Sequence, residues 1–285
     1  MGEEMTYQFL VSTGRTSVKQ FLFAALPSFS RFALRQAAAA GACRVDGEVV
    51  PASYKLREGQ KVEFTLVPEA QRTILAEALP LVILYEDEAI IGLHKQVGML
   101  VHPTSRERNG TVANALLGHW RGESRRPTFP HRLDRETSGV LLVAKDAQAA
   151  TSLAVQFEHR RVKKEYVALV AGEILEAREI DAPIGRVGGE VPPWQVRLEG
   201  KASLSRLTPI ERWGDRTLVQ LEPVTGRTNQ LRIHCAWIGH PIVGDRIYGG
   251  SEAGRLWLHA RRLTFEHPRS GHRMTLDAGM MQINY

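Results

Sequence analysis

The stretch that decides the fold of most of this chain is PHRLDRETSGVLLVAK, residues 130–145. A polar, turn-forming segment leads into an apolar run, which predicts a loop that enters a buried strand. Asp134 stands in that loop between Arg132 and Arg135. Positive charge on both sides favours the ionised carboxylate, so Asp134 is a candidate nucleophile or base. The plainer alternative is a structural ion pair with one of the two arginines.

A second motif is TGRTNQLRIH, residues 225–234. Gly226 permits a tight turn, Thr228 can cap a helix, and Gly239 is placed to end it. Arg227 is therefore expected at a loop-to-helix junction, where a guanidinium can hold a carboxylate in a two-pronged ion pair. Asp134 is a candidate partner, although residue order alone does not select it.

Around these motifs, short apolar runs predict strands with only a few helices between them. The predicted strands cover residues 81–85, 89–93, 140–144, 166–170 and 218–221. This mixture predicts an α+β fold with a mixed, mainly antiparallel sheet over residues 79–285, and not a regular βαβ succession.

Residues 11–68 predict a separate small helical and hairpin domain. Its expected elements are two helices, a hairpin and a further strand, at residues 17–26, 30–40, 43–50 and 61–66. Arg31 and Arg35 lie four residues apart and so share one face of the second helix. That face could meet an RNA backbone, and a simply solvated basic face fits the spacing equally well.

The composition is that of a globular protein with a basic surface. The 285 residues are 43% hydrophobic and 24% charged, which excludes extended disorder. The formal net charge is +6 and the isoelectric point is about 9.5. Clustered Lys and Arg gain free energy by displacing counterions from phosphates, so this balance favours a polyanionic partner.

Several other classes of protein are disfavoured. Cys43 and Cys235 stand far apart, the histidines are scattered, and no Gly-rich phosphate-binding loop is present, so we expect neither a metal nor a cofactor. The longest apolar run is too short to span a bilayer, and the N-terminus is acidic where a signal peptide would be basic. We therefore expect a cytoplasmic protein without membrane contact, with a monomer as the default state.

From residue 79 to its C-terminus, the chain resembles the RluA-type pseudouridine synthases. The resemblance rests on the two motifs above and on runs that follow them: HRLD at 131–134, TSG at 137–139, TGRT at 225–228, QLRIH at 230–234, GHPIVGD at 239–245, LHA at 258–260 and FEHP at 265–268. Residues 11–68 resemble the alpha-L RNA-binding domain named after a small-subunit ribosomal protein, through Ser30-Arg31, Ala40-Gly41 and Val45-Asp46-Gly47.

The resemblance implies an enzyme that isomerises uridine in structured RNA without a cofactor. It implies that Asp134 is the catalytic aspartate and Arg227 its ion-pair partner. It assigns Tyr166, in KEYVALV at 164–170, to stacking on the target base, with its hydroxyl helping the final proton removal. By the same resemblance Arg132 assists extrusion of the nucleotide, and Ile233 forms the aliphatic wall of the pocket.

The sequence departs from the family pattern at two places, and it leaves the substrate open. Asn229 stands where His is usual, and Lys95-Gln96 stands where Lys-Pro is usual. The N-terminal module favours ribosomal RNA, while transfer RNA stays possible. The alternatives are a non-catalytic RNA-binding or ribosome-assembly factor on the same scaffold and a metal-dependent nuclease, which would need a cluster of ligands that the sequence does not offer.

Overall fold

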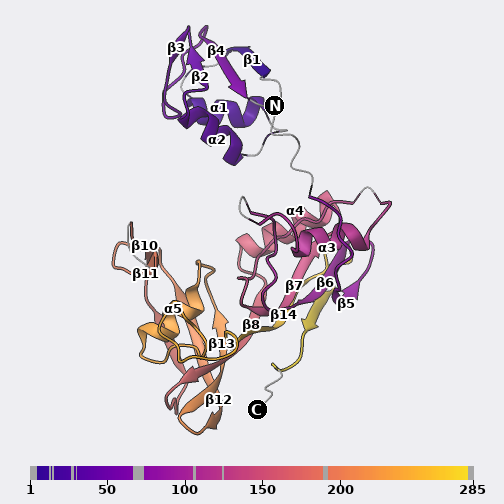
Figure 1. Cartoon of the computed structure of the whole chain (residues 1–285), viewed down its shortest axis with the longest axis vertical. Coiled ribbons are helices and arrows are strands. Elements are labelled where there is room, and N and C mark those ends of the chain that lie inside the picture. Colours follow the sequence, from indigo (N-terminus) through magenta and orange to yellow (C-terminus); the bar gives the residue numbers. More distant parts are fainter. Residues whose placement is uncertain are drawn as a thin grey trace. The chain divides into compact units, whose positions relative to one another are not determined.

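The chain divides between Thr73 and Ile74 into two units, each with its own core (Figure 1). The computed structural model describes residues 5–12, 14, 16–26, 29, 31–66, 74–104, 107–123, 125–188 and 192–281, without the side chains at 31–33 and 36. The expected second helix is present, but Ser30, which precedes it, and the side chain of Arg31 lie outside this description.

The first unit is a four-stranded antiparallel sheet with two helices. Its strands lie in the order β1 (Met5–Leu10), β4 (Lys61–Leu66), β2 (Cys43–Val45) and β3 (Glu48–Val49), and its helices are α1 (Val18–Ala25) and α2 (Arg31–Ala39). The elements expected from the sequence are present. The additional strand β1 precedes the expected start at residue 11, because it pairs along its whole length with β4.

Local signals explain these elements. Ser17 and Gln20 form a reciprocal capping box at the start of α1, which satisfies backbone N–H groups that the first helical turn leaves open. Asp46 and Gly47 both adopt positive φ, as the tight turn between β2 and β3 requires. Phe64 of β4 is fully buried against both helices' apolar residues and anchors the core.

The second unit is built on a nine-stranded sheet. Eight strands follow the order β5 (Val82–Glu86), β6 (Ile90–Lys95), β7 (Ser138–Ala144), β14 (Leu258–Glu266), β8 (Lys163–Ala171), β13 (Arg216–Pro223), β12 (Leu204–Trp213) and β9 (Arg178–Asp181), and β15 (Arg273–Asp277) pairs with β14. Within the described ranges, β7 and β14 pair in parallel and the other pairings of this sheet are antiparallel. The predicted α+β, mainly antiparallel fold is confirmed.

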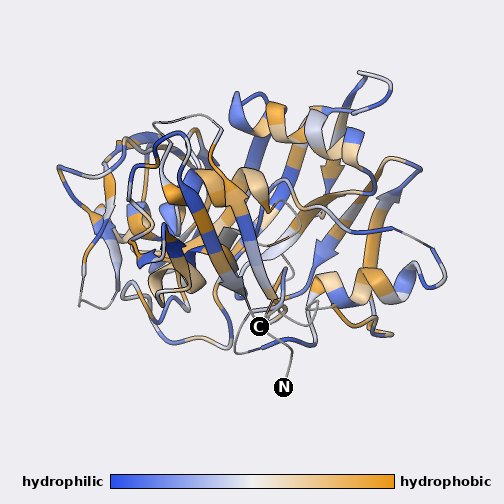
Figure 2. Cartoon of the chain, turned by 90° about the horizontal axis from the view of Figure 1, so that it is seen from above, coloured by the Kyte–Doolittle hydropathy of each residue, from blue (hydrophilic) through white to orange (hydrophobic). Residues whose placement is uncertain are grey.

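Strand β7 is buried over its whole length, as its apolar run predicts. Its even-numbered residues pack with α4 (Ala147–Glu158), and its odd-numbered residues pack with α3 (Val112–His119). The two-residue period of a strand thus places a helix on each face. In Figure 1 both helices lie by the β5–β7 half of the sheet, and Figure 2 shows strands rich in hydrophobic residues joined by mostly hydrophilic loops.

The other half of the sheet carries α5 (Gln230–Trp237), with the short hairpin β10 (Ile184–Arg186) and β11 (Trp194–Val196) beside it (Figure 1). Leu231 and Cys235 of α5 pack on Ala168 of β8 and Val219 of β13. This packing fixes α5 across the centre of the sheet, and with it the polar residues at its first turn.

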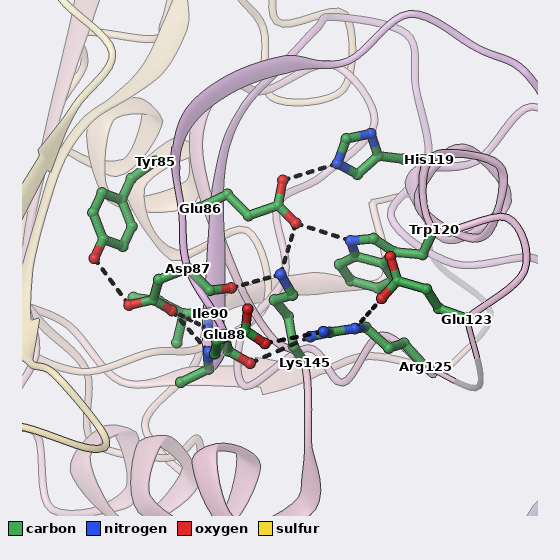
Figure 3. A network of polar contacts seen from close by, with 11 residues as sticks. Tyr85, Glu86, Asp87, Glu88, Ile90, His119, Trp120, Glu123, Arg125 and Lys145 are labelled. Carbon is green, nitrogen blue, oxygen red and sulfur yellow. Dashed lines mark hydrogen bonds and ion pairs between the residues drawn. The ribbon is translucent and has the colours of Figure 1, made fainter.

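A charged network holds the end of β7. Lys145, directly after the strand, donates to Glu86 over 2.8 Å, and the same carboxylate accepts hydrogen bonds from Trp120 and lies 2.8 Å from His119 (Figure 3). Burial alone would raise the pKa of Glu86, but hydrogen bonds from Lys145, Trp120 and His119 lower it to about 2. The network ties β5 and α3 to β7.

Candidate active site

A cleft of about 980 Å³ crosses the middle of the large sheet. The residues that line it come from the loop before β7, from α4 and the turn after it, from β8, and from the segment between β13 and α5. Both sequence motifs therefore reach the same cavity. Asp134, Tyr166, Arg132 and Arg227 all lie on its walls.

Lys95 anchors the loop that carries Asp134. This buried ammonium donates hydrogen bonds of 2.9, 2.9 and 3.0 Å to the carbonyl groups of Gln96, Met99 and Arg135. Burial lowers the pKa of Lys95 to about 8, against the opposing charges of Glu136 and Asp134. Gln96, which stands where the expected pattern has Pro, thus contributes its backbone carbonyl to the site of Lys95.

The end of the same loop requires a glycine. Gly139 has φ of +113°, and a Cβ on it would lie 2.1 Å from the carbonyl oxygen of Ala260, because β7 and β14 meet there in parallel. Next to it, the hydroxyl of Ser138 accepts a 2.6 Å hydrogen bond from Arg255 and contacts His259 Nδ1 at 2.8 Å. These contacts fix the point at which the loop enters β7.

The most constrained cation of the cleft is Arg232, in the first turn of α5. Its Nε and Nη2 both donate to Asp245 over 2.7 Å, and its guanidinium lies 5.2 Å from the ring centre of Tyr248. Asp245 is fully buried and also accepts from the backbone N–H groups of Ile247 and Tyr248. Burial opposes the charge of Arg232, but Asp245 and then Asp134 raise its pKa above the usual value.

The remaining nitrogen of Arg232 faces Asp134. Nη1 lies 3.9 Å from Oδ2 of the aspartate, within ion-pair range and beyond a hydrogen bond. The Asp134 side chain is 35% exposed to the cleft. Among the described residues, no donor makes a hydrogen bond to its carboxylate oxygens. The carboxylate therefore sits beside a fixed positive charge with its lone pairs free.

The expected pairing of Asp134 with Arg227 is wrong in this structure. The Arg227 guanidinium donates to the carbonyl of Ala202 through Nε and Nη2, each over 3.2 Å, and the ion pair is made by Arg232. The expected cap also differs. Helix α5 follows Asn229, which has φ of +54° and no capping hydrogen bond, and not Thr228. Arg227 consequently lies in the loop before α5, and its side chain binds the backbone of Ala202.

Tyr166 lies on β8 and is partly buried between two hydrophobic clusters of the core. Burial, followed by the negative charge of Asp134, raises the pKa of its phenol. The hydroxyl therefore stays protonated at neutral pH, with a flat aromatic face on the cleft wall. This is the surface on which a planar base could stack.

The other predicted site residues separate into two groups. Arg132 is exposed on the cleft wall, as a residue that contacts RNA must be, and Arg35 is exposed on α2 with its guanidinium 5.4 Å from the ring centre of Phe23. Ile233 is buried in α5 and does not line the cleft, whereas Leu231 and Leu258 are among the aliphatic residues that do. Successive helical residues point about 100° apart, so Ile233 cannot share the direction of Arg232.

Sequence reasoning missed Arg232 and Asp245 as a pair, although both belong to quoted motifs. Each of the two charged residues stands beside apolar residues in its motif. The structure buries the residues of α5 around Arg232 and buries Asp245 completely. A buried charge of each sign in neighbouring motifs predicts that the two meet. Within the described residues, no group of three or more His, Cys, Asp or Glu side chains could hold a metal ion, and no helix has the length and hydropathy to cross a membrane.

Comparison with known proteins bears on all of these motifs. The family model described as RNA pseudouridylate synthase matches residues 89–237. An RNA pseudouridine synthase of Bacillus subtilis is 36% identical over 92% of this chain and 89% of its own length. The ribosomal large subunit pseudouridine synthase D of Pseudomonas aeruginosa is 36% identical over 88% of this chain and 84% of its own. The solved structure of human RNA pseudouridylate synthase domain containing 1 matches with a TM-score of 0.62 and 32% identity, over 72% of this chain and 85% of that one.

Proposed function

Because the chain belongs to the RluA-type family of RNA pseudouridine synthases, we propose that it isomerises uridines of ribosomal RNA and that Asp134 carries out the reaction. The observation that carries the assignment of Asp134 is its environment. Its carboxylate faces the cleft without a hydrogen-bond donor among the described residues, 3.9 Å from an arginine that Asp245 holds in place.

The reaction detaches uracil from ribose, turns the base in place and rejoins it through carbon 5. An ionised carboxylate without competing hydrogen bonds is suited to this task, since it can attack the sugar, stabilise an oxocarbenium-like centre or remove a sugar proton. Arg232 places a positive charge beside Asp134. Because Asp245 takes up the other two prongs of the guanidinium, Arg232 stays in position when Asp134 changes its charge during the reaction.

Tyr166 has a different part in this scheme. The target base must leave its stack before the carboxylate can reach the sugar, and a flat phenol on the cleft wall compensates part of the unstacking cost. Arg132, exposed at the same wall, is suited to fill the place that the base vacates. At neutral pH the phenol of Tyr166 is protonated, so it acts first as a hydrogen-bond donor.

The charge of the cleft fits a polyanionic substrate. Eight cationic side chains line it against three carboxylates: Arg132, Arg160, Arg161, Lys163, Lys164, Arg206, Arg227 and Arg232 against Asp134, Glu158 and Glu222. Basic residues around a deep pocket draw the phosphate backbone to the site while the base enters it.

The choice of ribosomal RNA is supported by two features. The relative from Pseudomonas aeruginosa is named for the large ribosomal subunit, and Arg31 and Arg35 stand four residues apart in helix α2 of the first unit. Replacing both arginines by alanine in the full chain should weaken binding to ribosomal RNA. It should also reduce the slope of log affinity against log salt concentration by the amount that corresponds to about two phosphate contacts. Arg57→Ala, an exposed change outside that helix, is the control. Unchanged binding of the double variant would reject the docking role.

The experiment that tests the proposal is release of tritium from RNA labelled at carbon 5 of uracil, because that hydrogen is lost when the new bond forms. We expect release from ribosomal RNA or from partly assembled ribosomal particles, and none from a transfer RNA pool. Release from transfer RNA alone would overturn the substrate. No release from any of the three would overturn the proposed function.

A further inference from the structure

One partly buried cation of the cleft, Lys164, has neither a carboxylate partner nor a hydrogen-bond acceptor among the described residues. Lys164 is partly buried on β8, and no described carboxylate lies within 4 Å of its ammonium, nor does that ammonium donate a hydrogen bond to a described residue. The neighbouring Lys163 differs, since it lies 3.3 Å from Glu165 and 3.8 Å from Glu222. Adjacent lysines of one strand thus have opposite electrostatic surroundings.

The surroundings of Lys164 come from three other elements, and none of them is negative. Its Nζ lies 5.5 Å from the ring centre of Phe157 on α4, and a Cβ on Gly226 would lie 3.7 Å from it. His131 stacks on Phe157 and accepts a hydrogen bond from the backbone of Leu142, so its imidazole is neutral. Burial also lowers the pKa of Lys164, as expected for an ammonium that lacks a counter-charge.

The position of Lys164 relates it to the reacting base. Side chains alternate along a strand, so Lys164 and Tyr166 project from the same face of β8 at a spacing of about 7 Å. By the same alternation Lys163 and Glu165 project together from β8 and lie 3.3 Å apart, and Lys163 reaches the cleft lining as an ion-paired residue. Both side chains line the cleft, so a base stacked on Tyr166 would bring its own backbone phosphates toward the wall that carries Lys164.

We propose that the Lys164 ammonium binds a backbone phosphate of the nucleotide that enters the cleft. The negative charge of the phosphate neutralises the Lys164 ammonium, for which the described residues provide no carboxylate. The bound phosphate fixes the ribose relative to Asp134, so Lys164 is a positioning residue for the reaction. The inference rests on the proposed function, because it takes RNA as the occupant of the cleft.

The test compares Lys164→Met with the wild type in tritium release and in binding of a large-subunit ribosomal RNA transcript over a range of salt. We expect KM and the dissociation constant to rise about fivefold to tenfold, kcat to change less than about threefold, and the salt slope to fall by about 0.7 to 0.9. Lys164→Arg should restore the slope. Lys201→Met, an exposed change outside the cleft, should leave KM, kcat and the slope nearly unchanged.

Two results would overturn this role. A wild-type salt slope in Lys164→Met would exclude a phosphate contact, and an equal defect in Lys164→Arg would indicate packing and not charge. Failure of the proposed function has a different signature. The wild type would then release no tritium from any RNA, while the binding titration still decides whether Lys164 meets a phosphate.

Discussion

The two ends of β7 carry two different kinds of charged cluster. After the strand, Glu86, Lys145, His119 and Trp120 satisfy one another (Figure 3). Before it, Asp134 faces the cleft with an ion pair of 3.9 Å and no hydrogen bond from the described residues. A closed network contributes to the stability of the fold, whereas an open carboxylate beside a fixed guanidinium keeps its reactivity for a substrate. The difference predicts which substitutions affect stability and which affect catalysis.

Apart from a change of Asp134 itself, the largest effect on this comparison should come from Arg232→Lys. A lysine cannot bind Asp245 with two prongs and reach Asp134 as well, so the aspartate loses its aligned positive charge. We expect kcat to fall about 100-fold, with a folded protein that still binds RNA. Single-turnover tritium release, with circular dichroism to check the fold, measures this. A loss of less than threefold would show that the ion pair is not part of catalysis.

Next in size is Lys145→Met at the other end of β7. It removes a donor from a partly buried carboxylate and should lower the free energy of unfolding by about 2 kcal/mol. Activity per folded molecule should be unchanged, because the residue lies outside the cleft lining. Urea denaturation checks the first expectation, with Lys201→Met as control. If activity fell while stability did not, the two clusters would not be as separate as their contacts indicate.

A smaller effect is expected from pH. Burial, followed by the charge of Lys164, lowers the pKa of His131 from 6.5 to about 3. Between these values the unfolded chain binds the proton and the folded one does not, so stability is fully present above pH 6.5 and is lost as pH falls toward 3. Relative to neutral pH, this difference in proton binding lowers the free energy of unfolding by about 1 to 2 kcal/mol at pH 5.

His131→Gln keeps a hydrogen-bond acceptor for the backbone of Leu142 and removes this titration. Urea denaturation between pH 7 and pH 4.5 should therefore show a shallower loss of stability in the variant than in the wild type. His272→Gln, at an exposed histidine, is the matched control and should keep the wild-type slope. Identical slopes in all three proteins would contradict a partly buried, neutral imidazole at residue 131.

The smallest effect should come from Arg227→Ala. Its guanidinium contacts only a backbone carbonyl among the described residues and lies apart from Asp134. We expect kcat to change less than about threefold and RNA binding to weaken slightly, by the loss of one cation from the cleft. The same tritium assay compares it with Arg232→Lys. A 100-fold loss in Arg227→Ala would restore it as the partner of Asp134.

The sequence predicted best what depends on neighbours along the chain. The loop before β7 and the strand itself are contiguous, and the turn at Asp46-Gly47 needs only positive φ, so these were predicted correctly. The strand β1 was missed because it is defined by pairing with β4, more than fifty residues away. Local pattern is informative where the structure is local.

The choice between two arginines could not be made from the sequence. Arg227 and Arg232 stand in one motif, and either spacing allows a guanidinium to reach the loop before β7. The outcome depends on where α5 begins and on Asp245, thirteen residues further along, which fixes one arginine and not the other. Side-chain direction at a helix start is set by such tertiary contacts.

The most direct test of the account is tritium release from ribosomal RNA by Asp134→Asn, measured beside its RNA affinity. The amide keeps the shape of the carboxylate and removes its charge. We predict that release falls below detection while the dissociation constant for RNA changes less than about threefold, because the carboxylate acts on the sugar and contributes little to binding. Turnover by Asp134→Asn within tenfold of the wild type would contradict the account, because the reaction would then not depend on the carboxylate of Asp134.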